Sequence, residues 1–135
     1  MGTRSLTIVK DGRSTILKMY RQMDGYPSGH GKELYEFLKN IKMFNGLGED
    51  RTNIANGVGC LAAQIVAHFK KAPGGFYLLP VSPVDYGQEY EYHIHVDDAE
   101  IKIKVIETDY GSQPAVKLFN GTVQKFGKFC ERDSE

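Results

Sequence analysis

The hydrophobic and polar positions of this chain follow two periods, and the change between them separates strands from helices. Apolar and polar residues alternate strictly over residues 88–96 and 100–106, and two aspartates mark a turn between them. That pattern predicts a β-hairpin with one buried and one exposed face. Alternation over residues 5–10 and 14–21, around an Asp-Gly turn, predicts a second hairpin.

Apolar residues return every three to four positions in two other segments, residues 32–43 and 56–71. This spacing predicts two amphipathic helices. Ser28 and Asn56 precede them and are the expected N-caps, because both side chains can accept from unpaired backbone N–H groups. Three shorter β-rich segments predict further strands, at residues 76–81, 115–119 and 122–126.

The order of these elements, β-β-α-α-β-β-β, segregates helices from most of the strands. Segregation favours an α+β fold, with an antiparallel sheet of about 5–6 strands and two helices packed on one face. No repeat or linker interrupts the chain, so we expect one domain over residues 1–127. Residues 128–135 are polar and predict a frayed C-terminal tail.

Composition narrows the possible partners. Lysine plus arginine equals aspartate plus glutamate at 17 each, so no net field attracts a long nucleic acid. No apolar run approaches the roughly 20 residues of a membrane span, and the start of the chain does not resemble a signal peptide. We therefore expect a cytoplasmic protein without membrane contact, in which Cys60 and Cys130 are reduced thiols.

Residues 20–31, YRQMDGYPSGHG, form the most unusual segment and lead into the first predicted helix. Glycines allow a ligand to approach the backbone, and the start of a helix favours an anion such as phosphate. Arg21 can bind phosphate, Asp24 can accept from a ribose hydroxyl, and Tyr26 can stack on a base. With Ser28 and His30, these residues predict a contact surface for a nucleotide-like molecule; the alternative is a purely structural loop.

A second glycine-containing helix start, residues 56–59, follows the same logic. It lacks both the third glycine of a dinucleotide fingerprint and the Gly-Lys-Ser/Thr of a P-loop. Close helix packing is the simpler interpretation of its glycines. Arg51 and Asn56 are nevertheless placed to join a polar pocket, and we include Arg4 among the candidate contacts.

Catalytic and metal motifs receive little support. His93 and His95 have the His-x-His spacing of metal ligands, but solvated histidines are the simpler interpretation. No nucleophile stands beside an evident base, although Asp24 and His30 could act as a general acid–base pair. We expect no cofactor and no resident metal. Tyr77 flanks a loop where it could line a binding face, although a packing role is the simpler interpretation.

Several of these motifs resemble one family. GTRSLT at residues 2–7, YRQMDGYPSGHG at 20–31, and NGVGCLAAQIVAHFK at 56–70 with GGFYL at 74–78 are similar to small proteins of bacteriophages, prophages and assorted bacteria. The resemblance spans roughly the first 80 residues and implies a phage-related genome, hence the cytoplasm of a bacterial host. It carries over no activity and no catalytic residue. Small phage proteins with a polar, nucleotide-suited pocket and no catalytic signature include sponges, which sequester nucleotide signals of bacterial immunity.

Three hypotheses follow. The first is a non-catalytic, oligomeric protein that sequesters a cyclic-nucleotide or ADP-ribose-type signal. Its contacts would be Arg4, Arg21, Asp24, Tyr26, Ser28, His30, Arg51 and Asn56. The second is a nucleotide phosphodiesterase or other hydrolase that uses Asp24 and His30. The third is a protein–protein inhibitor that binds through an exposed sheet edge and has no small ligand.

Overall fold

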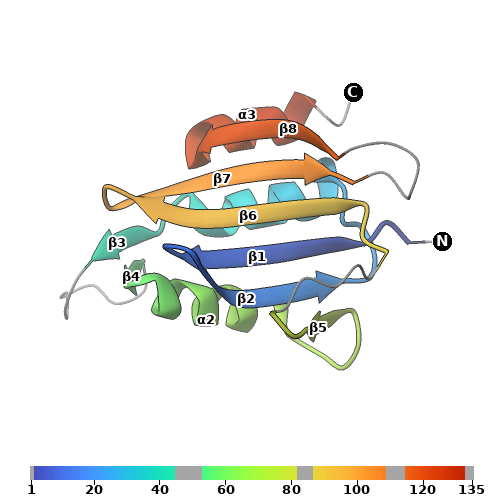
Figure 1. Cartoon of the computed structure of the whole chain (residues 1–135), viewed down its shortest axis with the longest axis horizontal. Coiled ribbons are helices and arrows are strands. Elements are labelled where there is room, and N and C mark those ends of the chain that lie inside the picture. Colours follow the sequence, from blue (N-terminus) through green and yellow to red (C-terminus); the bar gives the residue numbers. More distant parts are fainter. Residues whose placement is uncertain (1, 45–52, 82–86, 109–114, 133–135) are drawn as a thin grey trace.

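The computed structural model describes residues 2–44, 53–81, 87–108 and 115–132, and a sheet of six strands organises them. The strands are β1 (Ser5–Asp11), β2 (Ser14–Arg21), β5 (Phe76–Leu78), β6 (Tyr90–Asp97), β7 (Glu100–Glu107) and β8 (Val116–Thr122). They lie side by side in the order β5-β2-β1-β6-β7-β8 (Figure 1). The second hairpin of the chain, β6–β7, therefore sits in the same sheet as the first, β1–β2.

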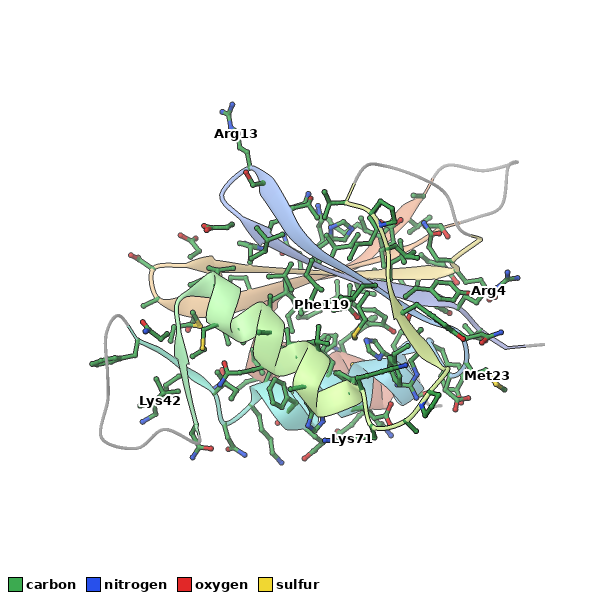
Figure 2. The ribbon with its side chains drawn as sticks, turned by 90° about the horizontal axis from the view of Figure 1, so that it is seen from below. Arg4, Arg13, Met23, Lys42, Lys71 and Phe119 are labelled. Carbon is green, nitrogen blue, oxygen red and sulfur yellow. The ribbon has the colours of Figure 1, made fainter. Side chains whose placement is uncertain are left out.

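Helices cover one face of this sheet and leave the other free of helices (Figure 2). They are α1 (Lys32–Leu38), α2 (Val58–Phe69) and α3 (Val123–Arg132), and a π-helical turn, η1 (Pro27–Gly31), runs directly into α1. A separate two-stranded ladder pairs β3 (Lys42–Phe44) with β4 (Ile54–Asn56). The predicted α+β class is confirmed, with a third helix in the described chain beyond the two expected.

The sheet is mostly antiparallel, as predicted, but it contains one parallel pair. Both predicted hairpins are confirmed, because β1 pairs with β2 and β6 with β7 in antiparallel register. β6 then lies parallel to β1, with Ser5 opposite Tyr90 and Val9 opposite Ile94. Since β2 already occupies one side of β1, β6 adds to the other side, which places β1 in the interior of the sheet.

Alternation along the strands builds the core beneath the helices. Tyr92 and Ile94 of β6 and Ile103 and Val105 of β7 are fully buried, as their period predicted. They pack against buried residues of all three helices, including Leu34, Ile65 and Phe126. Each such apolar side chain contributes about 1.5–3 kcal/mol on burial, so this face holds the layers together.

The carboxyl end of the chain differs from its prediction. β8 extends to Thr122, and residues 123–132, predicted to belong to a strand over 122–126 and a tail from 128, form helix α3 instead. Phe126 and Cys130, four residues apart, are fully buried on one side of this helix. Their helical spacing is masked in the sequence by the lysines and glycine around them, and burial against Phe119 and Tyr92 decides the structure.

Neither predicted N-cap serves that function. Ser28 lies inside η1, because the helical path already begins at Pro27, whose fixed φ suits the first helical position. Asn56 ends strand β4, and the N-cap of α2 is Gly57, whose φ of 88° lies in the region that favours glycine. The strand can therefore turn sharply into α2.

Two other elements are shorter than predicted. The helix expected over residues 32–43 ends at Leu38, because residues 42–44 pair with β4. The strand expected over 76–81 comprises Phe76–Leu78. Arg51, one of the candidate contacts, lies outside the described residues.

Candidate functional site

The predicted site, residues 20–31, is centred on Arg21 and His30, and the structure joins these two side chains to each other. The guanidinium Nη1 of Arg21 lies 3.1 Å from Nδ1 of His30. The other ring nitrogen, Nε2, lies 2.7 Å from Oγ1 of Thr7 on β1. His30 is fully buried, and both of its nitrogens are occupied within the protein.

The protonation state of His30 follows from these partners. Arg21 can only donate, so Nδ1 accepts and the proton resides on Nε2, which donates to Thr7. Burial, and then the positive charge of Arg21, lower the pKa of His30 from 6.5 to about 3. Its ring packs against Phe69 and Tyr92 at centroid distances of 5.0 Å. His30 is a neutral core histidine and presents no nitrogen to a ligand.

Arg21 is engaged through Nε, through Nη1 and through the face of its guanidinium. Its Nε donates to the carbonyl oxygen of Met23 at 2.6 Å, and Nη1 also donates to the Glu33 carboxylate on α1. The guanidinium lies 5.0 Å from the centre of the Phe76 ring. With its side chain only 12% exposed, Arg21 ties the end of β2 to α1 and β5.

The helix start that we expected to hold an anion has its N–H groups occupied. The amides of Gly29 and Gly31 donate to the carbonyl of Tyr26, and the amide of His30 donates to the carbonyl of Asp24 at 2.8 Å. A phosphate would have to displace these bonds. The predicted anion cradle therefore has no free N–H group at Gly29, His30 or Gly31.

The glycines of the segment serve packing. A Cβ on Gly25 would lie 2.7 Å from Cβ of Ser5, and one on Gly31 would lie 2.7 Å from Sγ of Cys130. Close approach to β1 and α3 therefore explains glycine at both positions. The loop is bound to the core by backbone contact.

Asp24, Tyr26 and Ser28 are more accessible. Asp24 and Tyr26 are exposed, and the tyrosine hydroxyl points to the Asp24 carboxylate at 3.4 Å. Asp24 has a φ of 62°, a conformation that Asp tolerates better than most residues. Ser28 is half-buried within η1. These residues lie on the surface around the structural Arg21–His30 pair.

The two glycine-containing helix starts do not share a pocket. Asn56 closes β4, which lies at one end of the sheet, whereas Arg4 and the end of β2 lie at the other (Figure 1). Asn56 is exposed there. Arg51 cannot be placed, because it falls outside the described residues. The structure thus separates Asn56 from the other candidate contacts that it describes.

One candidate residue, Arg4, does line a hollow. This hollow has a volume of about 230 Å³ and lies where β1 begins and β2 ends; it is lined by Gly2, Arg4, Tyr20 and Gln22. The Arg4 side chain projects from this end of the sheet in Figure 2, and its guanidinium has no partner in the described chain. Tyr77, opposite Tyr20 on β5, lies beside that ring at a centroid distance of 6.2 Å, but it lines a separate hollow with Phe76 and Leu78. The ammonium of Lys70 lies 5.5 Å from the centre of the Tyr77 ring.

Tyr20 and Gln22 lie within the predicted segment 20–31 but were not named as contacts, and Tyr77 was named only as a residue that could line a binding face. Tyr20 follows the β2 alternation and looks like any strand residue, and β5 was predicted without a pairing partner. Only the β2–β5 register brings the two tyrosines together. Nothing in the sequence indicates that Arg4 and Tyr20 come together in one hollow.

His93 also differs from expectation. Its side chain is 14% exposed, and Nε2 bonds Oε1 of Glu91 at 2.9 Å. The bond from His93 lowers the pKa of the Glu91 carboxyl, and a second bond from Gln88 acts in the same direction. His93 is thus half of an ion-pair-like contact, and the prediction of a solvated histidine is wrong.

Within the described ranges, no three His, Cys, Asp or Glu side chains converge to hold a metal ion. No helix there is long and apolar enough to cross a membrane. Comparison of the chain with protein-family models, curated proteins and solved structures finds no match. The function proposed below accordingly rests on the geometry of the chain.

Proposed function

We propose that this chain is a non-catalytic binding protein that captures a small, nucleotide-like anion at the hollow formed by Arg4, Tyr20 and Gln22. The observation that supports the proposal most strongly is the guanidinium of Arg4, which has no partner among the described residues and shares the hollow with Tyr20. Arginine binds phosphate through two parallel hydrogen bonds, and a tyrosine ring offers a face to a base. Gln22 is exposed and supplies both a donor and an acceptor.

The hollow also bears on the size of the ligand and the assembly. At about 230 Å³ it is smaller than most ligand pockets, which span roughly 300–1,000 Å³. A cyclic nucleotide or an ADP-ribose derivative would therefore extend beyond it. A second protomer could supply the missing surface, which agrees with the proposed oligomer.

Sequestration accounts for the residues better than hydrolysis does. The acid–base pair of the hydrolase alternative would be Asp24 and His30, but His30 is buried and both its nitrogens are engaged. A base must reach the proton that it removes. The resemblance to phage and prophage proteins makes a signal of bacterial immunity a candidate ligand class.

A ligand panel tests the proposal. The protein is incubated with cyclic di- and trinucleotides and ADP-ribose derivatives, the melting temperature is measured, and the bound compound is analysed after denaturation. We expect one class to raise the melting temperature and to be released intact. Release of an altered compound would favour the hydrolase, and the absence of any shift would contradict both.

Two arginine variants locate the site. Arg4→Ala should weaken binding by about tenfold or more, because a charge-assisted pair is lost. Arg13→Ala, at the β1–β2 turn on the other end of the strands, is the matched control and should bind normally (Figure 2). Equal binding by both variants would place the ligand elsewhere.

A further inference from the structure

The helix-free face of the sheet carries a cluster of cationic and histidine side chains. Strand register sets His93 opposite Lys104 and His95 opposite Lys102 on adjacent strands β6 and β7. Lys10 projects from β1 two residues after Ile8, which pairs with His93. Because alternate residues share a face, these side chains stand on the side opposite the buried Ile94 and Ile103. We call Lys10, His93, His95, Lys102 and Lys104 the basic strip.

Two carboxylates on the same strand faces are already engaged, whereas Asp97, two residues after His95, is exposed at the turn. Glu91 bonds His93 and Gln88, and Glu100 pairs with Lys102 at 2.9 Å. Lys10, Lys104 and His95 have no bonding partner within the part of the chain that the structure describes. Two ammonium groups on this face, those of Lys10 and Lys104, are therefore left without a carboxylate partner among the described residues.

The shape of this face favours a macromolecular partner. Side chains on a sheet stand in a grid, with neighbouring strands about 4.8 Å apart and alternate residues about 6.7 Å apart. Figure 1 looks onto this face, with the helices behind the sheet. A broad grid of charges matches an extended anionic surface better than an enclosed small molecule.

The side chains of the basic strip suit an acidic protein segment better than a single-stranded nucleic acid. Single-stranded nucleic acid is held by aromatic rings on which its bases stack. The basic strip contains no Tyr or Phe, and Tyr20 and Tyr77 lie beyond β1 at the β5 edge. The carboxylates of an acidic protein segment can bind to the lysine ammonium groups without any aromatic ring. We infer that the basic strip is a docking surface for an acidic protein segment.

Fluorescence anisotropy with a labelled oligo-glutamate peptide tests this surface, with oligothymidylate of matched charge as the comparison. The unmodified protein should bind the peptide at low ionic strength, and binding should weaken as salt screens the charges. The double variant Lys10→Glu/Lys104→Glu should bind about tenfold or more weakly, because attraction becomes repulsion at both positions. Its neutral counterpart, Lys10→Gln/Lys104→Gln, should show an intermediate loss.

The matched control reverses two exposed lysines of α3 on the helix side, Lys125→Glu/Lys128→Glu. It makes the same change in net charge and should leave peptide binding unchanged. An equal loss in both double variants would overturn the proposal, since only net charge would then matter. No peptide binding, or tighter binding of oligothymidylate, would overturn it too. Circular dichroism verifies that each variant is folded.

Discussion

The guanidinium of Arg21 lies 3.1 Å from Nδ1 of His30 and fixes the imidazole as its neutral Nε2–H tautomer. Oγ1 of Thr7 accepts a hydrogen bond from the Nε2–H group of His30. The segment with the strongest signature of a ligand loop is thus held by its own arginine and histidine. Both residue types can serve recognition or structure, and burial decides between the two.

Acid should destabilise the protein through His30. Its pKa in the folded state, about 3, lies below the 6.5 of the unfolded chain, so protonation favours unfolding. This stability is complete above the unfolded pKa and is lost as the pH falls below it. From about pH 7 to about pH 5, His30 should lower the free energy of unfolding by about 2 kcal/mol. Urea denaturation at several pH values measures this.

The variant His30→Gln isolates this contribution. A glutamine amide can still accept from Arg21 and donate to Thr7, but it does not titrate. The slope of stability against pH should become shallower over this range. Parallel slopes for His30→Gln and the unmodified protein would refute the neutral, buried histidine.

Arg21→Ala should destabilise the fold more than it affects ligand contact. The change leaves Nδ1 of His30 without its donor and frees the carbonyl of Met23, at a cost of about 2 kcal/mol or more. Arg4→Ala removes a side chain without a partner in the described chain and should stay within about 0.5 kcal/mol. Thermal and urea unfolding compare them. Normal stability with lost ligand binding in Arg21→Ala would restore the loop as the site.

Gly31→Ala should destabilise the contact between η1 and α3. The new Cβ would meet Sγ of Cys130 at 2.7 Å in the buried core, which costs about 1–3 kcal/mol. Adding Cys130→Ala removes that sulfur and should recover part of the loss, as a double-mutant cycle would show. Additive effects of the two changes would argue against the contact.

Gly59→Ala is the matched control for that substitution. Nothing lies within 4 Å of a Cβ at this position in α2. Alanine should therefore stabilise the helix, by about 0.5–1 kcal/mol. A loss of stability in Gly59→Ala would indicate that Gly59 packs against another surface.

Phe126→Ala tests the helix that replaced a predicted strand and tail. Phe126 is fully buried and contacts Tyr92 and Phe119 with its ring, so its truncation should cost about 3–5 kcal/mol. Phe44→Ala, at a ring that is 46% exposed, should cost much less. Denaturant unfolding provides both values. Equal costs would mean that α3 does not close the core.

Strand pairing within hairpins could be predicted from sequence, because it depends on local alternation and a turn. Residues 88–96 and 100–106 alternate, and β6 and β7 pair throughout their length. The parallel contact of β1 with β6 could not be predicted this way, since it joins residues about 85 positions apart. Helix α3 was missed because its buried stripe is only a few residues wide.

In the candidate site, too, local features could be predicted from sequence, whereas contacts with distant residues could not. Glycines and a proline predicted a loop over residues 22–29 that enters a helix; the structure has this entry, but the helical path already begins at Pro27. Whether Arg21 and His30 face solvent or the core depends on Thr7, Glu33 and Phe76, which come from three other elements. The pairing of Tyr20 with Tyr77 likewise requires the register of β5.

The sequence by itself determined the α+β class, the two hairpins and the helical path after the loop. Periodicity and turn residues act over a few positions, so one chain suffices to read them. Only the tertiary structure decided that His30 is neutral and buried, that Arg21 is bonded within the protein and that Arg4 has no partner among the described residues. Whether a polar side chain is structural or free to bind a ligand depends on its bonding partners and on its exposure to water. Contacts between distant segments determine both.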